Sequence, residues 1–401
     1  MSQQNHAPPP HQADPARPPV ILQVLPALVT GGVERGSVDL AGVLTEAGWT
    51  ALVVSSGGHM VRELDRFGVH HMTLPVHSKN PLVIKANITR LENIIRQYNV
   101  DIVHARSRAP AWSAFYAAQN TGRHFVTTFH GTYNTGLFGL KNAYNAIMTR
   151  GERVIAISHF IANHMQAVYN TDPGRIRVVH RGIDLDIFDP TRVSQERIIQ
   201  LAQRWRLTDG HPVIMLPGRL TRWKGQQVLI EALALLGRRD LRCLLVGSDQ
   251  GRTGYTEELQ ALVQARGLSE VVHIVGECND MPAAYMLTDV VVSASTDPEA
   301  FGRVIVEAQA MGRSVVATDN GAGRENVLEE QTGLLVPPHD AGALALAVDR
   351  VLAIGPSDRE ARAALAIEFV RKNFSRELMC RRTMEVYREL LDSGPAREKQ
   401  L

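Results

Sequence analysis

The 401-residue sequence has only three cysteines, Cys243, Cys278 and Cys380, and they share no close spacing. This excludes a disulfide framework and a thiolate metal site, and it fits a reducing cytoplasm. Net charge is also nearly absent, with 43 Lys and Arg against 41 Asp and Glu, so the broad positive surface of a general nucleic-acid binder is not expected. No run approaches the roughly 18 uninterrupted apolar residues that a membrane-spanning helix needs.

What is present is ordinary globular composition, with 44% hydrophobic and 21% charged residues. At roughly 150 residues per domain, the length predicts two or three domains, each able to bury a sizeable core. Residues 1–19 are the exception, because they hold six prolines and no apolar segment. We predict that they form a disordered, solvated tail.

Short apolar runs alternate with amphipathic stretches, the pattern typical of parallel sheets with crossover helices. The runs expected to form strands are 20–26, 51–55, 69–74, 101–104, 125–129, 154–157 and 176–180, then 213–216, 243–246, 271–275, 290–293, 315–318 and 333–336. A stretch rich in Gly, Asp and Pro, 181–190, suits an interdomain connection. We therefore predict an α/β domain over 20–190, a second over 191–372, and a C-terminal helix over 373–401 that returns toward the first.

The loop after the first predicted strand reads Thr30-Gly31-Gly32-Val33-Glu34 and opens a helix. Glycines there allow close backbone approach to a ligand, and a helix start presents unpaired N–H groups to an anion. The spacing is not the Gly-x-Gly-x-x-Gly of dinucleotide-binding proteins. A purely structural turn is the alternative interpretation of this loop.

The corresponding loop of the second half, 217–225, carries three cations, Arg219, Arg222 and Lys224. It is not a Walker loop, because Trp223 stands where the glycine before the lysine belongs. Preorganised cations and backbone N–H groups can stabilise a departing diphosphate without a metal. Arg219 and Lys224 are the candidates for this role, and a solvated basic loop is the alternative.

Two glutamates, Glu299 and Glu307, flank the sequence Ala-Phe-Gly-Arg-Val-Ile-Val. If a helix starts at Gly302, Glu299 lies in the loop before it and Glu307 lies on the helix. Carboxylates accept paired hydrogen bonds from hydroxyls, which suits a sugar and a ribose. The alternative is a helix-capping or surface pair.

Taken together, these motifs resemble those of retaining glycosyltransferases of family 4, over roughly residues 20 to 390. The glutamates match the family's E-x7-E motif, 30–34 its glycine loop, 218–225 its phosphate loop, and 333–337 its late strand and turn. The resemblance implies an α/β architecture called GT-B, with two Rossmann-like doubly wound domains facing across a cleft. It also implies that C-terminal helices pack back on the first domain.

The resemblance further implies a role for each matching residue. Those expected to bind a nucleotide diphosphate sugar are Gly31, Gly32, Arg219, Lys224, Glu299, Ala300, Phe301, Gly302 and Glu307. Those expected to act in catalysis are His130, Glu299, Lys224 and Arg219. In these assignments Glu299 holds the sugar, Glu307 the ribose, and His130 lies beside the transferred sugar. A satisfied structural histidine is the alternative for His130, and neither a metal nor another cofactor is expected.

The chain departs from the family pattern in two places. Residues 321–325 read Gly-Ala-Gly-Arg-Glu where many relatives have Gly-Gly-x-Pro-Glu, and Arg303 puts a cation inside the glutamate motif. Whether Arg303 meets an anionic part of the donor or faces solvent stays open. The segment 184–186, Asp-Leu-Asp, matches a D-x-D metal motif only superficially, because it lies in the expected interdomain connection, and we reject a metal there.

The acceptor is expected on the first domain. His104, Arg106 and Arg108 follow a predicted strand, and the two arginines suit a phosphate or carboxylate on an anionic glycolipid. Ordinary solvated arginines are the alternative. Other basic residues of this half are compatible with peripheral contact with an anionic membrane, on the cytoplasmic face of the inner membrane. The resemblance to the family also implies a glycan or glycolipid acceptor in lipopolysaccharide or exopolysaccharide assembly.

The expected reaction moves a hexose from the nucleotide sugar to a hydroxyl with retention of anomeric configuration. Front-face attack is favoured, since the sequence shows no identifiable pair of close carboxylates for a double displacement. Two other classes stay open. One is a non-catalytic carbohydrate- or membrane-binding protein of the same fold, and the other, less favoured, is an NAD-dependent oxidoreductase.

Overall fold

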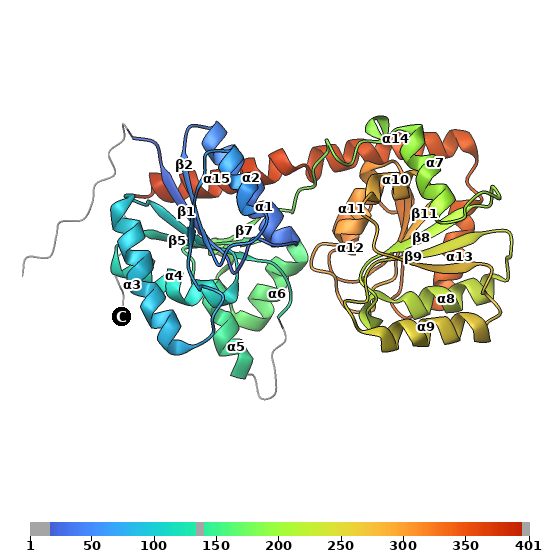
Figure 1. Cartoon of the computed structure of the whole chain (residues 1–401), viewed down its shortest axis with the longest axis horizontal. Coiled ribbons are helices and arrows are strands. Elements are labelled where there is room, and N and C mark those ends of the chain that lie inside the picture. Colours follow the sequence, from blue (N-terminus) through green and yellow to red (C-terminus); the bar gives the residue numbers. More distant parts are fainter. Residues whose placement is uncertain (1–16, 134–139, 395–401) are drawn as a thin grey trace, which may run out of the picture. The chain divides into compact units, whose positions relative to one another are not determined.

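The computed structural model describes residues 17–133 and 140–394, and it divides the chain into two compact units. The first unit contains the chain up to His180 together with Glu377 onward, and the second contains Arg181–Arg376. Each unit is a fully parallel sheet with helices on both faces (Figure 1). All thirteen predicted apolar runs form strands of these two sheets.

The first sheet has the strand order β3-β2-β1-β4-β5-β6-β7. Its strands are β1 (Val20–Val24), β2 (Thr50–Ser55), β3 (His70–Thr73), β4 (Ile102–Ala105), β5 (His124–Phe129), β6 (Arg153–Ala156) and β7 (Ile176–Val178). Its helices are α1 (Gly32–Glu46), α2 (Val61–Arg66), α3 (Pro81–Gln97), α4 (Arg108–Asn120), α5 (Leu140–Asn145), α6 (His159–Tyr169) and α15 (Arg376–Asp392). The central strands are buried along their whole length, as expected when helices cover both faces.

The second sheet has the order β10-β9-β8-β11-β12-β13. Its strands are β8 (Val213–Pro217), β9 (Arg242–Val246), β10 (Val272–Gly276), β11 (Val290–Ser293), β12 (Ser314–Thr318) and β13 (Gly333–Val336). Its helices are α7 (Gln195–Arg204), α8 (Gln226–Leu236), α9 (Thr253–Ala265), α10 (Met281–Met286), α11 (Arg303–Ala310), α12 (Gly323–Asn326), α13 (Ala341–Leu352) and α14 (Pro356–Asn373). Apolar side chains of α8, α9 and α13 form one core with the strands, while α14 packs against α11.

The last helix, α15, belongs to the first unit, as the resemblance implied for the C-terminal region. Cys380, Met384, Tyr387 and Leu390 are buried in the same core as side chains of α1 and β1. Glu389 adds a polar anchor, because its carboxylate pairs with Arg153 of β6, at 2.7 Å, and with Arg177 of β7.

The segment between the two units groups with the second unit. Ile183 donates its backbone N–H to the carbonyl of Phe374 (2.8 Å) and accepts from the N–H of Arg376 (2.9 Å), and Arg376 also pairs with Asp184 at 2.5 Å. The observed division therefore falls after His180, whereas 181–190 was expected to close the first domain.

The predicted disordered tail ends earlier than expected. Residues 1–16 lie outside the described part of the chain, but Arg17 binds both carboxylate oxygens of Asp101, at 2.6 and 2.9 Å. The backbone carbonyl of Pro19 accepts a hydrogen bond from Thr50 at the start of β2. Residues 17–19 are thus fixed to the first sheet, and including them in the tail was wrong. Within the described chain, no helix combines the length and apolarity of a membrane span.

Candidate functional site

The second sheet brings the phosphate loop and the glutamate motif to one place. Strands β8 and β11 are neighbours although they are not consecutive, so the strand order reverses between them. In open parallel sheets, ligands bind beyond the carboxyl ends of the strands at such a reversal. The loop after β8 carries Arg219 and Lys224, and the loop after β11 carries Glu299.

These two loops are held together by their backbones. Gly225 has a φ of 72°, in the left-handed region, and a Cβ at this position would overlap the carbonyl oxygen of Ala294. The N–H of Thr296 donates to the carbonyl of Trp223 at 2.8 Å. Glycine is therefore required at 225 both by its dihedral angle and by the close approach of the second loop.

Lys224 and Glu299 form an ion pair across the loops, through Nζ and Oε1. Both side chains are largely buried, with exposed fractions of 12% and 13%. Ser295 donates its hydroxyl to the same carboxylate oxygen at 2.6 Å, and the Lys224 ammonium lies 4.4 Å from the centre of the Trp223 ring. The structure thus brings together two predicted residues whose opposite charges suit a diphosphate and sugar hydroxyls.

The segment 321–325, which departs from the family pattern, fixes the main chain of Glu299. The N–H of Ala322 donates to the carbonyl of Glu299 at 2.8 Å. Gly321 has a φ of 65°, and a Cβ there would overlap the backbone of Glu299. Glycine at 321, with its backbone in the left-handed region, therefore fixes the main chain of Glu299 without contacting its carboxylate.

Glu307 is buried on α11, with only 8% of its surface exposed. Its Oε2 accepts a hydrogen bond from the hydroxyl of Tyr285 at 3.0 Å, and its Oε1 accepts one from Nε of Arg303 at 2.6 Å. Burial raises the pKa of Glu307, and these two donors oppose that shift. Arg303, whose role the sequence left open, is thus the ionic partner of Glu307 and keeps 42% of its side chain exposed.

The other residues of this unit that were predicted to bind the nucleotide sugar differ in the groups that they present to a ligand. Arg219 is exposed and its guanidinium has no ion pair with any described residue, so it is available to an anion. Phe301 is buried against Phe374, with ring centres 5.8 Å apart, so only its backbone is available to a donor. Gly302 has a φ of 77° and immediately precedes α11.

In the first sheet, the strand order reverses between β1 and β4. Gly31 and Gly32 lie at the start of α1, after β1, and Arg106 directly follows β4. His130 directly follows β5 and is half-buried. Arg108, at the start of α4, donates to Oδ1 of Asn145 at 2.9 Å and lies 4.1 Å from the centre of the Tyr133 ring.

His104 is not placed to contact an acceptor, and that assignment was wrong. Its side chain is fully buried in β4, and both ring nitrogens are engaged, Nδ1 with the Tyr387 hydroxyl at 2.6 Å and Nε2 with the Thr128 hydroxyl at 2.7 Å. Burial holds the pKa of His104 well below its ordinary value. The imidazole is therefore a neutral part of the core.

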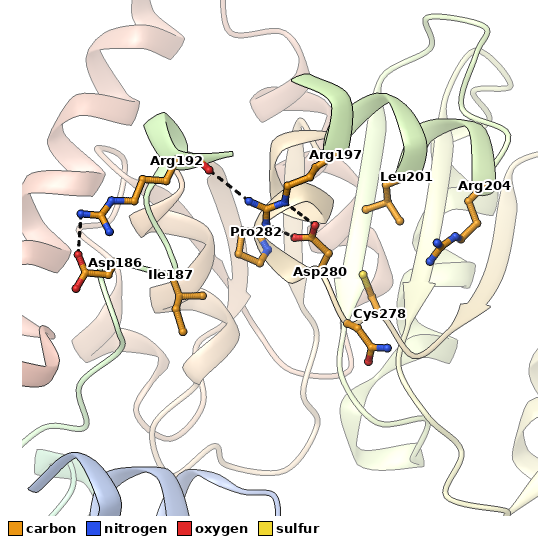
Figure 2. Close-up of a pocket in the computed structure, with 10 residues that line it drawn as sticks. Asp186, Ile187, Arg192, Arg197, Leu201, Arg204, Cys278, Asp280 and Pro282 are labelled. Atoms are coloured by element: carbon orange, nitrogen blue, oxygen red, sulfur yellow. Dashed lines mark hydrogen bonds and ion pairs between the residues drawn. The ribbon is translucent and has the colours of Figure 1, made fainter. Parts of the chain in front are cut away.

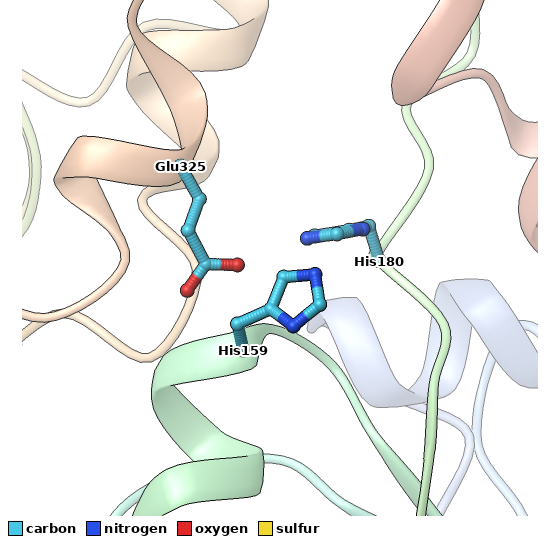
Figure 3. Close-up of side chains that lie close together, drawn as sticks. All are labelled: His159, His180 and Glu325. Atoms are coloured by element: carbon cyan, nitrogen blue, oxygen red, sulfur yellow. The ribbon is translucent and has the colours of Figure 1, made fainter.

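Two further histidines of the first unit, His159 and His180, lie edge to face with ring centres 5.5 Å apart (Figure 3). His159 begins α6 and His180 follows β7. Two imidazoles supply fewer ligands than the three or four protein donors typical of a zinc site. This pair does not by itself make a metal centre.

The second unit also contains a cavity of about 650 Å³ between α7 and the loop after β10. Figure 2 shows Arg197, Leu201 and Arg204 along α7, with Arg197 pointing to Asp280. Arg197 holds both carboxylate oxygens of Asp280, at 2.6 and 2.8 Å. Among the described residues that line this cavity, none was predicted to bind the nucleotide sugar.

Sequence reasoning missed two polar partners, Tyr285 and Ser295. Tyr285 lies on α10, remote in sequence from the motif it supports, and nothing in its local pattern marks it. Ser295 had a signal, because it stands four residues before Glu299, directly after the β11 region.

Two family models match successive parts of the chain. Residues 30–187 match the family described as Glycosyltransferase Family 4, and residues 198–366 match Glycosyl transferases group 1. The D-inositol 3-phosphate glycosyltransferase of Xylanimonas cellulosilytica is 32% identical over 63% of this chain and 60% of its own length. That of Salinispora tropica is 30% identical over 76% of this chain and 67% of its own. The chain spans about half to three-fifths of the first curated relatives it matches.

Solved structures extend the similarity over most of the chain. A glycosyltransferase from Rickettsia africae is 41% identical, with a TM-score of 0.86, over 93% of this chain and 99% of its own. Anabaena HepE, in complex with UDP and glucose, is 24% identical, with a TM-score of 0.77, over 92% and 98%. At that identity the likeness shows the fold alone. Two family matches that together cover most of the chain, and the shared architecture, establish that it belongs to glycosyltransferase family 4 and has the GT-B fold.

Proposed function

We propose that the protein transfers a hexose from a nucleotide diphosphate sugar to a hydroxyl of a glycan or glycolipid, with retention of anomeric configuration. The observation that carries this proposal is the Lys224–Glu299 pair at the strand reversal, with buried Glu307 on the adjoining helix. Binding of UDP and glucose by HepE, which shares the fold, supports a nucleotide sugar as the donor.

In the proposed reaction, the bond between the anomeric carbon and the diphosphate oxygen breaks as the acceptor oxygen attacks from the same face. The acceptor proton passes to the departing diphosphate, so the products are the glycosylated acceptor and a nucleoside diphosphate. Arg219 and Lys224 would stabilise the charge that develops on the leaving group. The chain's own cations supply this stabilisation, so the proposal requires no metal.

Donor binding would exchange partners at Lys224 and Glu299, and it would give an anion to Arg219, which has no ion pair among the described residues. The diphosphate would take Lys224 from Glu299, and sugar hydroxyls would replace the ammonium on the freed carboxylate. The ribose would donate to Glu307, which Tyr285 holds in place from the buried side. Positioning and preorganised charge would then be the main contributions to rate.

The acceptor and the cellular setting are also proposals. Lipopolysaccharide or exopolysaccharide assembly fits the fold likeness to WaaG, a glycosyltransferase involved in lipopolysaccharide biosynthesis, which is 17% identical. The three free cysteines fit a cytoplasmic reaction, with a glycolipid presented at the inner membrane.

The test is release of nucleoside diphosphate from a panel of UDP-, GDP- and ADP-sugars with candidate acceptors. Lys224→Met and Glu299→Gln are expected to lose turnover, because each removes one charge of the central pair. Lys372→Met and Glu330→Gln, which change exposed residues of the same types, serve as controls and should keep it. Near-normal turnover of the Lys224 variant would overturn the assignment. Tight donor binding without turnover across the panel would favour the non-catalytic alternative.

A further inference from the structure

The loop between β11 and α11, which carries Glu299, is held by the segment that begins at the end of the neighbouring strand β12. The hydroxyl of Thr318, the last residue of β12, donates to the carbonyl of Ser295 at 2.8 Å. Nδ2 of Asn320 donates to the carbonyl of Thr296 at 2.9 Å. Because the carbonyl of Glu299 is held by the same segment, three carbonyls of this loop are tied to one stretch of chain.

The side chain of Asn326, at the end of α12, extends this series to a fourth carbonyl. Its Nδ2 donates to the carbonyl of Phe301, just before α11. Asn326 is fully buried, and its own backbone carbonyl accepts a hydrogen bond from Nε2 of Gln309 on α11 at 2.6 Å. The end of the loop is therefore tied to α12, and α12 is tied back to the helix that the loop precedes.

The contact with the Phe301 carbonyl fixes the direction of the next backbone N–H, that of Gly302. A trans peptide is planar, and its C=O and N–H point in opposite directions. The N–H of Gly302 therefore points away from Asn326, and no residue in the described part of the chain accepts a hydrogen bond from it. Gly302 is buried, and buried N–H groups are rarely left unpaired, so this one indicates a position that a ligand or a water completes.

The amides of Asn326 and Gln309 are costly for a purely structural role. Oδ1 of Asn326 and Oε1 of Gln309 are both buried and have no hydrogen-bond partner among the described residues. A buried acceptor left unpaired costs free energy that an apolar side chain would avoid. The two amides are better explained by the carbonyls that their NH₂ groups hold. Gly302 fits closely against this arrangement, since a Cβ there would lie 3.3 Å from Nδ2 of Asn326.

We propose that Asn326, supported by Gln309, is a positioning residue of the nucleotide-sugar site. By holding the carbonyl of Phe301, it keeps the N–H of Gly302 directed at an oxygen of the bound nucleotide sugar. Asn326 is fully buried and acts through the backbone, without touching the ligand itself. The ligand in this proposal rests on the proposed function, whereas the effect of Asn326 on the backbone does not.

The test replaces Asn326 by leucine, which has a similar volume but no amide. Thr332→Val is the matched control, because Thr332 is also buried in this unit and its hydroxyl accepts from the N–H of Leu328 at 3.0 Å, away from the loop. Hydrogen–deuterium exchange of the full chain is followed by mass spectrometry in peptides that cover 296–306. Calorimetry with UDP, GDP and ADP measures nucleotide affinity, well below the unfolding temperature of each variant.

In Asn326→Leu, amide exchange over 296–306 is expected to become faster than in the wild type. The Kd of the nucleotide that binds most tightly should rise about 10-fold, the ratio that corresponds to one hydrogen bond that binding must restore. Thr332→Val should change neither quantity, even where it lowers the unfolding temperature as much.

Asn326→Asp tests the donated hydrogen bond directly. The ionised carboxylate has no hydrogen to donate to Phe301, whereas the protonated carboxyl has one. The affinity of this variant relative to the wild type should therefore recover as the pH is lowered from about 8 to about 5. A side chain that only fills space would show no such recovery.

Three results would overturn the proposal. Wild-type exchange over 296–306 and wild-type affinity in Asn326→Leu would show that the loop does not depend on the amide. Equal losses in Asn326→Leu and Thr332→Val would show a general effect of stability. Faster exchange in Asn326→Leu with unchanged affinity for a nucleotide that the wild type binds would make Asn326 structural. If the wild type binds no nucleotide but exchange rises in Asn326→Leu alone, the proposed function fails while the backbone role of Asn326 stands.

Discussion

Glu307→Gln should weaken nucleotide binding while leaving the fold at least as stable at neutral pH. Each carboxylate oxygen of Glu307 has one donor from the chain, Tyr285 or Arg303, and the ribose would add its own hydroxyls. In glutamine one oxygen becomes an amide nitrogen, which cannot accept, and the charge is lost. Losing one charge-assisted hydrogen bond, about 1.5–3 kcal/mol, corresponds to an increase of about 10- to 150-fold in the Kd for UDP.

The stability of this variant follows from the sign of the Glu307 pKa shift. Burial raises the folded-state pKa, so folding favours the protonated form, and that contribution is lost as pH rises through the folded pKa. At neutral pH the wild type therefore carries a cost that glutamine lacks. The unfolding temperature of the variant should equal or exceed the wild type's at pH 7–8, and the difference should shrink toward pH 4.

Calorimetric titration with UDP and thermal unfolding at both pH values provide the measurements. Glu330→Gln is the matched control, because Glu330 is 58% exposed on the same unit and pairs only with a surface arginine. Unchanged UDP affinity in Glu307→Gln would refute the role of Glu307 in binding. A fall of several degrees at neutral pH would refute the argument that the buried charge is costly.

Three other predictions concern the pairs that hold the sites. Tyr285→Phe removes a buried donor to Glu307, so the free energy of unfolding, measured in urea, should fall by about 1.5–3 kcal/mol. Lys224→Met leaves Glu299 without its cation and should lower the free energy of unfolding by about 3 kcal/mol. The double variant, Lys224→Met with Glu299→Gln, should recover most of that loss. Glu389, held between two arginines, has its pKa lowered to about 2. Its stabilisation is present above the unfolded pKa and lost as pH falls toward 2, so Glu389→Gln should cost about 1 kcal/mol at pH 7, discounted for exposure, and almost nothing at pH 2.

The strands were predictable from sequence because buried parallel strands are continuous apolar runs. Such a run can be recognised within a single segment of the sequence, without knowing which strands lie beside it. The ends of the domains were not predictable in this way. Residues 17–19 resemble a tail by composition, and they are fixed to the sheet by contacts remote in sequence, of Arg17 with Asp101, 84 positions away, and of Pro19 with Thr50. The connection 181–190 groups with the second unit through backbone bonds to 374 and 376, which no local pattern marks.

The candidate site was predictable where a motif lies in one loop. Lys224 and Glu299 were both identified from their loops, but their direct contact depends on β8 and β11 being neighbours. The same limit explains the errors in the first unit. His104 lies within β4 and Arg106 lies just beyond its end. Residues two apart share one face of a strand, so no local pattern distinguishes the two. His104 is satisfied by Tyr387 and Thr128, while the Arg106 guanidinium has no partner among the described residues.

The charged pairs of the second unit bear on which ligands it would select. Lys224 and Arg303 are each paired with a glutamate, so a donor bound as proposed would exchange one partner for another. That exchange favours ligands that bring both an anion and hydroxyls, because an anion alone would free Lys224 but leave Glu299 without a substitute. In the first unit, the buried guanidinium of Arg106 makes no ion pair with any described residue. Selectivity for a whole nucleotide sugar over a simple anion would then arise at the Lys224–Glu299 pair.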